Sequence, residues 1–116
     1  MKVKEIPLSD RPREKLILRG VQALTDAELL AIFIRTGTKG VSVIEVAQKL
    51  ISKYANLSQL ALQSVESLQK NLGIGKDKAA TLVAAFEISR RLESQSKWFS
   101  DKSVTSPSDV ASVFIP

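Results

Sequence analysis

Residues 68–79 read LQKNLGIGKDKA, a run in which two glycines alternate with apolar residues between two stretches of helical character. Leu68 stands four positions before Leu72, and Ala79 stands four positions after Gly75, where a small residue lets the second helix pack against the first. Glycine reaches backbone angles that other residues avoid and leaves no side chain in the way of a ligand. No strand pattern precedes the run and a third glycine is missing, so it is not a dinucleotide-binding fingerprint. The run predicts two helices joined by a tight loop.

This loop resembles the helix-hairpin-helix, a motif that grips the backbone of nucleic acids. Its second helix begins with N–H groups that have no partner inside the helix, and such a terminus favours an anion. Lys76 and Lys78 add positive charge there, whereas Asp77 would repel a phosphate. The alternative is a tight turn between packed helices that binds nothing. The residues predicted to form the phosphate site are Leu72, Gly73, Ile74, Gly75, Lys76 and Lys78.

A second loop, TGTKG at residues 36–40, lies between two further predicted helices. Helix-hairpin-helix units often occur in pairs, so this loop is interpreted as a second, degenerate hairpin with contacts from Thr38, Lys39 and Gly40. The alternative is an ordinary interhelical connection. Arg13 belongs to a basic cluster near the N-terminus, which either extends the binding surface or forms ion pairs with neighbouring acids.

Helix signals cover most of the remaining chain. They comprise an acidic cap at Asp10 with Pro12 in the first turn, capping boxes at Thr25–Glu28 and Ser42–Glu45, a short helix near 57–62, a start at Ser64, and a long helix from about 76 to 94. The sequence therefore predicts an all-α fold, a compact bundle of five to six helices with one clear helix-hairpin-helix. We expect residues 1–95 to form this domain. Residues 96–116 are expected to be a linker and the truncated start of a second domain, beginning at Ser106–Pro107.

Composition restricts the chemistry of the chain. It has 116 residues, 44% of them hydrophobic, a net charge of +5 and no Cys or His. The missing residue types exclude zinc fingers, iron–sulfur sites, cysteine nucleophiles and histidine acid–base catalysis. We therefore expect no metal, no cofactor and no enzyme activity in this chain, and the positive charge makes a polyanion partner plausible. With no apolar run near the ~18 residues of a membrane span, we expect a soluble cytoplasmic protein.

Several motifs in order make the chain resemble the N-terminal domain of the bacterial RadC family, whose members carry a DNA-repair label. The matching segments are RPREKL at 11–16, ALTDAELLA at 23–31, RTGTKG at 35–40, and GIG at 73–75 with KAA at 78–80. The resemblance implies a following metallopeptidase-like domain of the JAMM/MPN type, with zinc ligands that are mainly histidines. The sequence departs from the family pattern at Lys76–Asp77, where Pro-Ala is frequent, and at Leu72, which is often basic.

These observations favour a non-enzymatic module that binds DNA phosphates without reading base sequence. The alternative is a regulatory helical domain that docks on the protein's own C-terminal domain or on another protein. The sequence does not indicate an oligomeric state.

Overall fold

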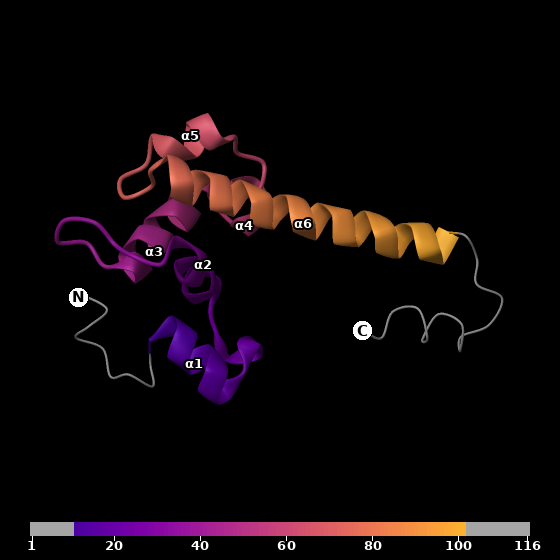
Figure 1. The fold of residues 1–116 in the computed structure, drawn as a ribbon, viewed down its shortest axis with the longest axis horizontal. Helices are drawn as coiled ribbons and strands as arrows, with labels where there is room; N and C mark the ends of the chain where they lie inside the picture. The colour runs from indigo at the N-terminus through magenta and orange to yellow at the C-terminus, as the bar shows by residue number, and fades with distance from the viewer. Residues whose placement is uncertain (1–10, 102–116) are drawn as a thin grey trace. The chain divides into compact units, whose positions relative to one another are not determined.

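The computed structural model describes the backbone of residues 11–101 and the side chains of residues 11–96. Within this range the chain is helical, in the order shown in Figure 1. The elements are α1 (Pro12–Arg19), the 3₁₀ helix η3 (Val21–Ala23), α2 (Asp26–Ile34), α3 (Val43–Tyr54), α4 (Leu57–Leu60), α5 (Val65–Gln69) and α6 (Lys76–Asp101). The described residues form no strand, and one isolated β-bridge joins Thr38 to Val41. The predicted all-α fold is confirmed.

The chain divides into two units, Met1–Val83 and Ala84–Pro116. The first unit holds α1 to α5 and the start of α6, and the second holds the remainder of α6. Both loops singled out by the sequence lie in the first unit.

Side-chain caps fix where four of the helices begin. Thr25 and Glu28 form the full predicted capping box, since each side chain accepts a hydrogen bond from the other residue's backbone N–H, at 3.2 and 2.9 Å. Ser42 accepts from the N–H of Glu45 at 3.2 Å, which is one half of the second predicted box. Asn56 and Ser64 cap α4 and α5 in the same way.

The start of α1 differs from its prediction. Its N-cap is Arg11, which makes no side-chain cap bond, and Asp10 lies outside the described residues. Pro12 occupies the first turn as predicted, where its missing N–H leaves no unpaired donor. The proline fixes the φ angle at the first helical position, which favours a helix start there.

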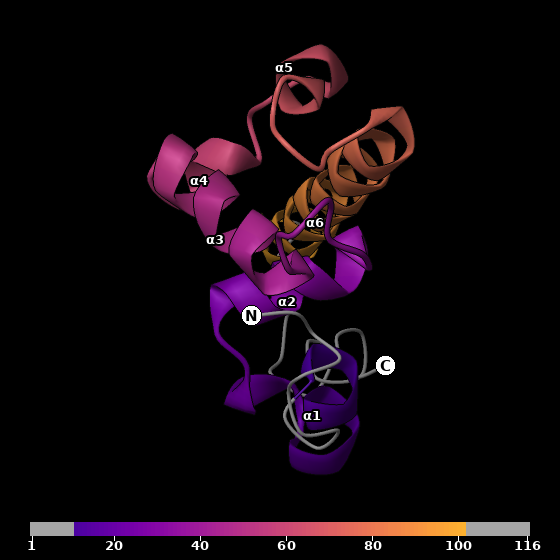
Figure 2. The same ribbon diagram turned by 90° about the vertical axis from the view of Figure 1, so that its left-hand side faces the viewer.

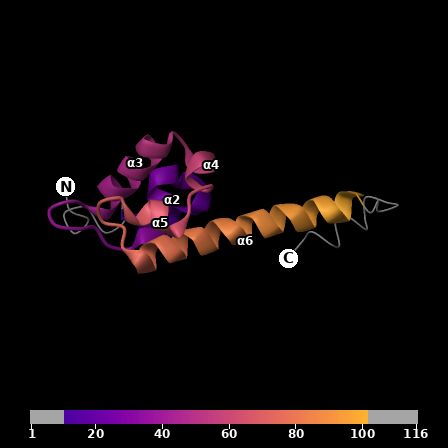
Figure 3. The same ribbon diagram turned by 90° about the horizontal axis from the view of Figure 1, so that it is seen from above.

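The core of the first unit lies where α2 packs on α3, a pair that can be followed in Figures 1, 2 and 3. The largest fully buried side chains come from five helices: Ile34, Val46, Leu50, Leu60, Leu68 and Leu82. Ala79 is completely buried, as expected for the small residue after the glycine loop. The buried set includes residues on both sides of that loop, so the loop is anchored at both ends.

Helix α6 extends to Asp101, beyond its predicted end near residue 94. The predicted helix end near residue 94 is therefore wrong, and residues 96–101 are helical, while the predicted linker beginning at residue 96 stays a prediction. No Gly or Pro interrupts this stretch, so no strong helix breaker ends α6 there. Ion pairs from Glu87 to Arg90 and Arg91, at 3.1 and 3.0 Å, support the preceding turn. The predicted start at Ser106–Pro107 lies outside the described residues.

None of the helices that the structure describes has the length and apolar character required to cross a lipid bilayer.

Candidate nucleic-acid interface

The two glycine loops line one open depression in the first unit, with a volume of about 520 Å³. Its lining residues are Gly37, Thr38, Asn71, Gly73, Ile74, Gly75, Lys76, Asp77 and Lys78. Most of the predicted phosphate-site residues are thus brought together, including Thr38 from the first loop. Lys39, Gly40, Leu72 and Arg13 do not line this depression.

The loop between α5 and α6 is held by burial and by one internal hydrogen bond. Ile74 is 3% exposed, and its N–H donates to the carbonyl of Asn71 at 3.1 Å. Gly73 has a φ angle of +83°, and a Cβ there would lie 3.1 Å from Cγ2 of Val46. Its backbone angle therefore favours glycine, and a side chain there would also crowd Val46 of α3. The Ile74 N–H is bonded within the loop, so Ile74 cannot donate its backbone N–H to a phosphate.

Helix α6 begins without a side-chain cap, because Gly75 precedes its first residue. Among the hydrogen bonds of the described residues, none has the N–H of Gly75, Lys76, Asp77 or Lys78 as its donor. A Cβ at Gly75 would meet nothing within 4 Å, so space does not require a glycine there. The glycine leaves the first amides of α6 uncovered, in contrast to the capped starts of α2 to α5.

Two lysines of this first turn have different roles. Lys78 donates from Nζ to the carbonyl oxygen of Thr36 at 2.5 Å and to its hydroxyl at 2.8 Å. Burial lowers the pKa of Lys78, and the nearby charge of Arg35 lowers it further. Lys76 is exposed and makes no hydrogen bond or ion pair among the described residues. Lys78 therefore ties α6 to the first loop, and Lys76 is the lysine whose ammonium group remains available for an anion.

Asp77 also lines the depression and is exposed. Its charge opposes an anion, although an acid in the first helical turn stabilises the helix itself. The depression thus has two positive side chains, Lys76 and Lys78, and one negative side chain, Asp77. The exposed amides add partial positive charge.

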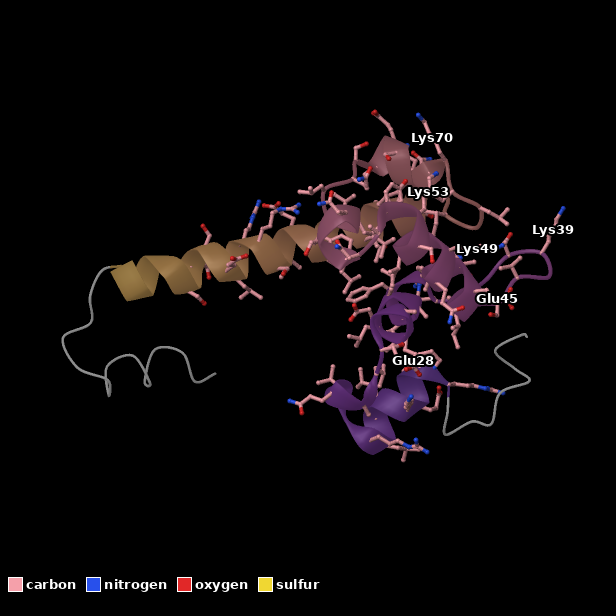
Figure 4. All side chains as sticks on the ribbon, turned by 180° about the vertical axis from the view of Figure 1, so that it is seen from behind. Glu28, Lys39, Glu45, Lys49, Lys53 and Lys70 are labelled. Carbon is pink, nitrogen blue, oxygen red and sulfur yellow. The ribbon has the colours of Figure 1, made fainter. Side chains whose placement is uncertain are left out.

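The first loop is a tight turn closed by two hydrogen bonds between Thr38 and Val41, at 3.0 and 2.8 Å. Gly40 has a φ of +70° at the third position of this turn, where glycine is favoured. A Cβ on Gly37 would lie 2.0 Å from the carbonyl oxygen of Val41, so the backbone passes too close for any side chain. Lys39 stands at the tip of the turn, exposed and pointing away from the chain (Figure 4).

Asn71 was missed by the sequence reasoning, although it lines the depression. Its side-chain amide donates to the Tyr54 hydroxyl at 3.0 Å and to the Leu68 carbonyl at 3.0 Å. The hydrogen bond from Asn71, and a second that Tyr54 shares with Ser67, lower the pKa of Tyr54. An amide side chain at the end of a helix, just before a glycine loop, was the available signal, since such residues satisfy terminal carbonyls.

Arg13 and Leu72 lie elsewhere. Arg13 is exposed, pairs with Glu14 at 3.5 Å and lines a second depression described below. Leu72 is 62% exposed and flanks the glycine loop. Among the described residues, no cluster of three or more acidic side chains could hold a metal ion, and the chain has no Cys or His to contribute.

These features define an all-α domain in which two interhelical glycine loops share one weakly cationic depression. The chain belongs to the UPF0758 N-terminal family, whose model matches residues 3–80.

Similar proteins carry the same family name. A UPF0758 protein of Staphylococcus aureus strain Newman is 44% identical over 116 residues, which is all of this chain and 50% of that protein. UPF0758 proteins of Staphylococcus carnosus and Moorella thermoacetica are each 46% identical, over 99% and 97% of this chain and 50% and 48% of theirs. The chain therefore spans about half the length of these relatives. No solved structure matches it.

Proposed function

We propose that this chain is a non-enzymatic module that binds the DNA phosphate backbone without reading base sequence. The observation that carries this proposal is the uncapped start of α6, which lies in a depression lined by both glycine loops. Unpaired amides at a helix start favour phosphate. Backbone contacts of this kind position a protein on DNA but carry little sequence information.

The surrounding charge and the motif pattern support the same ligand. Lys76 is exposed beside the amides, and the whole chain has a net charge of +5. The α5–loop–α6 segment has the residue pattern of a helix-hairpin-helix, and the chain resembles the RadC family with its repair label. The UPF0758 family name specifies no activity, so the DNA-repair role and a metallopeptidase-like second half are proposals too.

A charge reversal at the uncapped helix start tests the proposal. The double change Gly75→Asp and Lys76→Glu should place carboxylates at the exposed amides and weaken binding at least tenfold. Lys78 is left unchanged because it holds the first loop. Binding should be measured by fluorescence anisotropy with labelled duplex DNA at about 50 mM salt. Non-specific dissociation constants are roughly 10⁻⁴–10⁻⁶ M at physiological salt, and binding tightens as the salt concentration falls.

The matched control is Gln48→Glu with Lys49→Glu, which changes the net charge equally on the exposed face of α3 (Figure 4). This control should retain most of the parent affinity. If both variants fold and bind duplex as the parent does, the helix start is not the phosphate site.

A docking function is the second candidate, favoured by one observation. Ile17, Leu18 and Val21 are 71%, 66% and 55% exposed on α1 and η3. Where exposed apolar side chains form one contiguous patch, they often mark a protein contact. Absence of DNA binding at low salt by the folded parent would favour docking on the other half of the full-length protein.

A further inference from the structure

A second depression of about 290 Å³ lies in the first unit, outside the glycine loops. Its apolar lining comes from buried Pro12, Ala31 and Val43, and from Ile32, which is partly exposed. Its charged lining consists of three arginines and one acid: Arg11, Arg13, Arg35 and Glu14. Because the buried residues are apolar and the arginines are more exposed, this is an apolar floor with a cationic rim.

Arg35 is the unusual member of this rim. It ends α2 with a φ of +71°, and the N–H of Thr36 donates to the carbonyl of Ile34 at 2.9 Å, closing a three-residue turn. A positive φ is strained for arginine and relaxed for glycine. Strained residues of this kind cluster at functional sites. The guanidinium of Arg35 makes no hydrogen bond or ion pair with the described residues.

Arg35 also connects the two depressions. Its charge lowers the pKa of Lys78, after the larger effect of burial, and Lys78 lines the first depression. Gly37 follows Arg35 by two positions and lines the first depression as well, so about 7 Å of chain at most separates their Cα atoms. Adjacent units of one ligand could therefore occupy both depressions.

We propose that the second depression holds one unpaired nucleotide of a DNA strand whose neighbouring phosphate lies on the glycine loops. This inference rests on the proposed function. The base would lie on Pro12, Ile32 and Val43, with the planar guanidinium of Arg35 stacked against it. Arg13 would approach the phosphate, since Glu14 neutralises only part of the rim charge.

A nucleotide fits this lining better than an acidic peptide does. Carboxylate side chains would use the arginines but would leave the apolar floor without a partner. A nucleotide combines a flat apolar face with an adjacent phosphate and so uses both parts of the lining. The module would then prefer DNA with unpaired bases over continuous duplex.

The test compares two single strands with the same phosphate backbone. One is an oligothymidylate of about 12 nucleotides, within the usual range of ~4–16 for single-strand sites, and the other is an abasic strand of equal length. The parent protein should bind the oligothymidylate roughly five- to tenfold more tightly, which is the gain expected from stacking one base. Arg35→Gly, which relaxes the backbone while removing the guanidinium, should reduce this ratio to about one.

Lys49→Ala is the matched control, since it removes one positive charge from a residue that lines neither depression. It should weaken binding of both strands equally and preserve the ratio. If the parent binds the two strands with equal affinity, the inference is overturned. The proposed function still stands in that case, because both strands bind. A ratio in Arg35→Gly equal to that of the parent would also overturn the inference. Binding of polyglutamate with no binding of either strand would overturn both the inference and the proposed function.

Discussion

A Cβ atom on Gly37 would lie 2.0 Å from the carbonyl oxygen of Val41, whereas one on Gly75 would meet nothing within 4 Å. Gly37 is therefore required by packing between backbone segments. Gly75 precedes α6 at a position where serine or aspartate usually caps the helix. Glycine is tolerated at this position but supplies no side-chain acceptor, so it leaves the first amides of α6 uncovered, as the proposed phosphate site requires.

This contrast leads to a prediction for Gly75→Ser. The serine hydroxyl should cap α6 as Ser64 caps α5, raising the free energy of unfolding by a few tenths of a kcal/mol. The same hydroxyl should compete with phosphate for the amides and weaken DNA binding several-fold. Urea unfolding and anisotropy titration of one variant would measure both effects. A variant that is more stable and binds DNA as tightly as the parent would contradict the assignment.

The sequence indicated which residues carry the local chemistry, but it could not indicate their partners. Lys76 and Lys78 look equivalent in the sequence. In the structure Lys78 is committed to Thr36, 42 positions away. Such a pairing depends on how α6 packs against the first loop, and no local pattern encodes that packing.

At the level of helices, local signals were sufficient for most boundaries. Capping residues Thr25, Ser42 and Ser64 marked helix starts correctly, because a cap is a contact between residues three positions apart. The end of α6 was placed too early, because a serine- and lysine-containing stretch was interpreted as a linker. Helix ends without glycine or proline have weaker local signals.

The junction of α1 and α2 gives a prediction for pH dependence. Lys15 donates to both carboxylate oxygens of Glu28, at 3.2 and 3.0 Å, and Glu28 lies between the two helices in Figure 4. Burial acts to raise the pKa of Glu28, but hydrogen bonds from Thr25 and Lys15 outweigh it, so the pKa falls below 4.5. A carboxylate with a lowered pKa stabilises the fold above its unfolded-state value and loses that contribution as the pH falls through the folded value.

We therefore expect Glu28→Gln to lower the free energy of unfolding by about 0.5–1 kcal/mol at neutral pH. The difference from the parent should shrink as the pH falls below about 4.5, the ordinary glutamate value. Urea unfolding of both proteins at a series of pH values measures this difference in the free energy of unfolding. Glu66→Gln, at an exposed position of α5, is the control for the loss of one carboxylate elsewhere in the domain. A difference that stays constant with pH would show that the carboxylate charge is not responsible.

At the scale of the molecule, the structure adds what sequence motifs could not, namely that two loops distant in the chain line the same depression. Each loop was visible as a glycine pattern, and composition correctly indicated a basic, helical protein. The two loops lie close together because of contacts such as that between Gly73 and Val46, which join α3 to the segment before α6.

The small number of phosphate contacts available in this depression gives a prediction for salt dependence. With two to four phosphates engaged, log K should fall against log salt with a slope of roughly −2 to −4. Anisotropy titrations over a range of sodium chloride concentrations measure this slope. A much steeper slope would mean that charges across the wider surface, and not the loops, dominate binding. A slope near zero would exclude phosphate as the ligand.

The hydrogen bond between Tyr54 and Asn71 has a practical consequence. The chain has a single tyrosine, and its hydroxyl lies 3.0 Å from the amide nitrogen of a residue that lines the depression. A fluorine atom placed on that phenol ring would give one NMR resonance for the entire protein. Tyr54 does not itself line the depression, so this resonance would report a ligand through Asn71, without a label on the ligand or an added bulky dye.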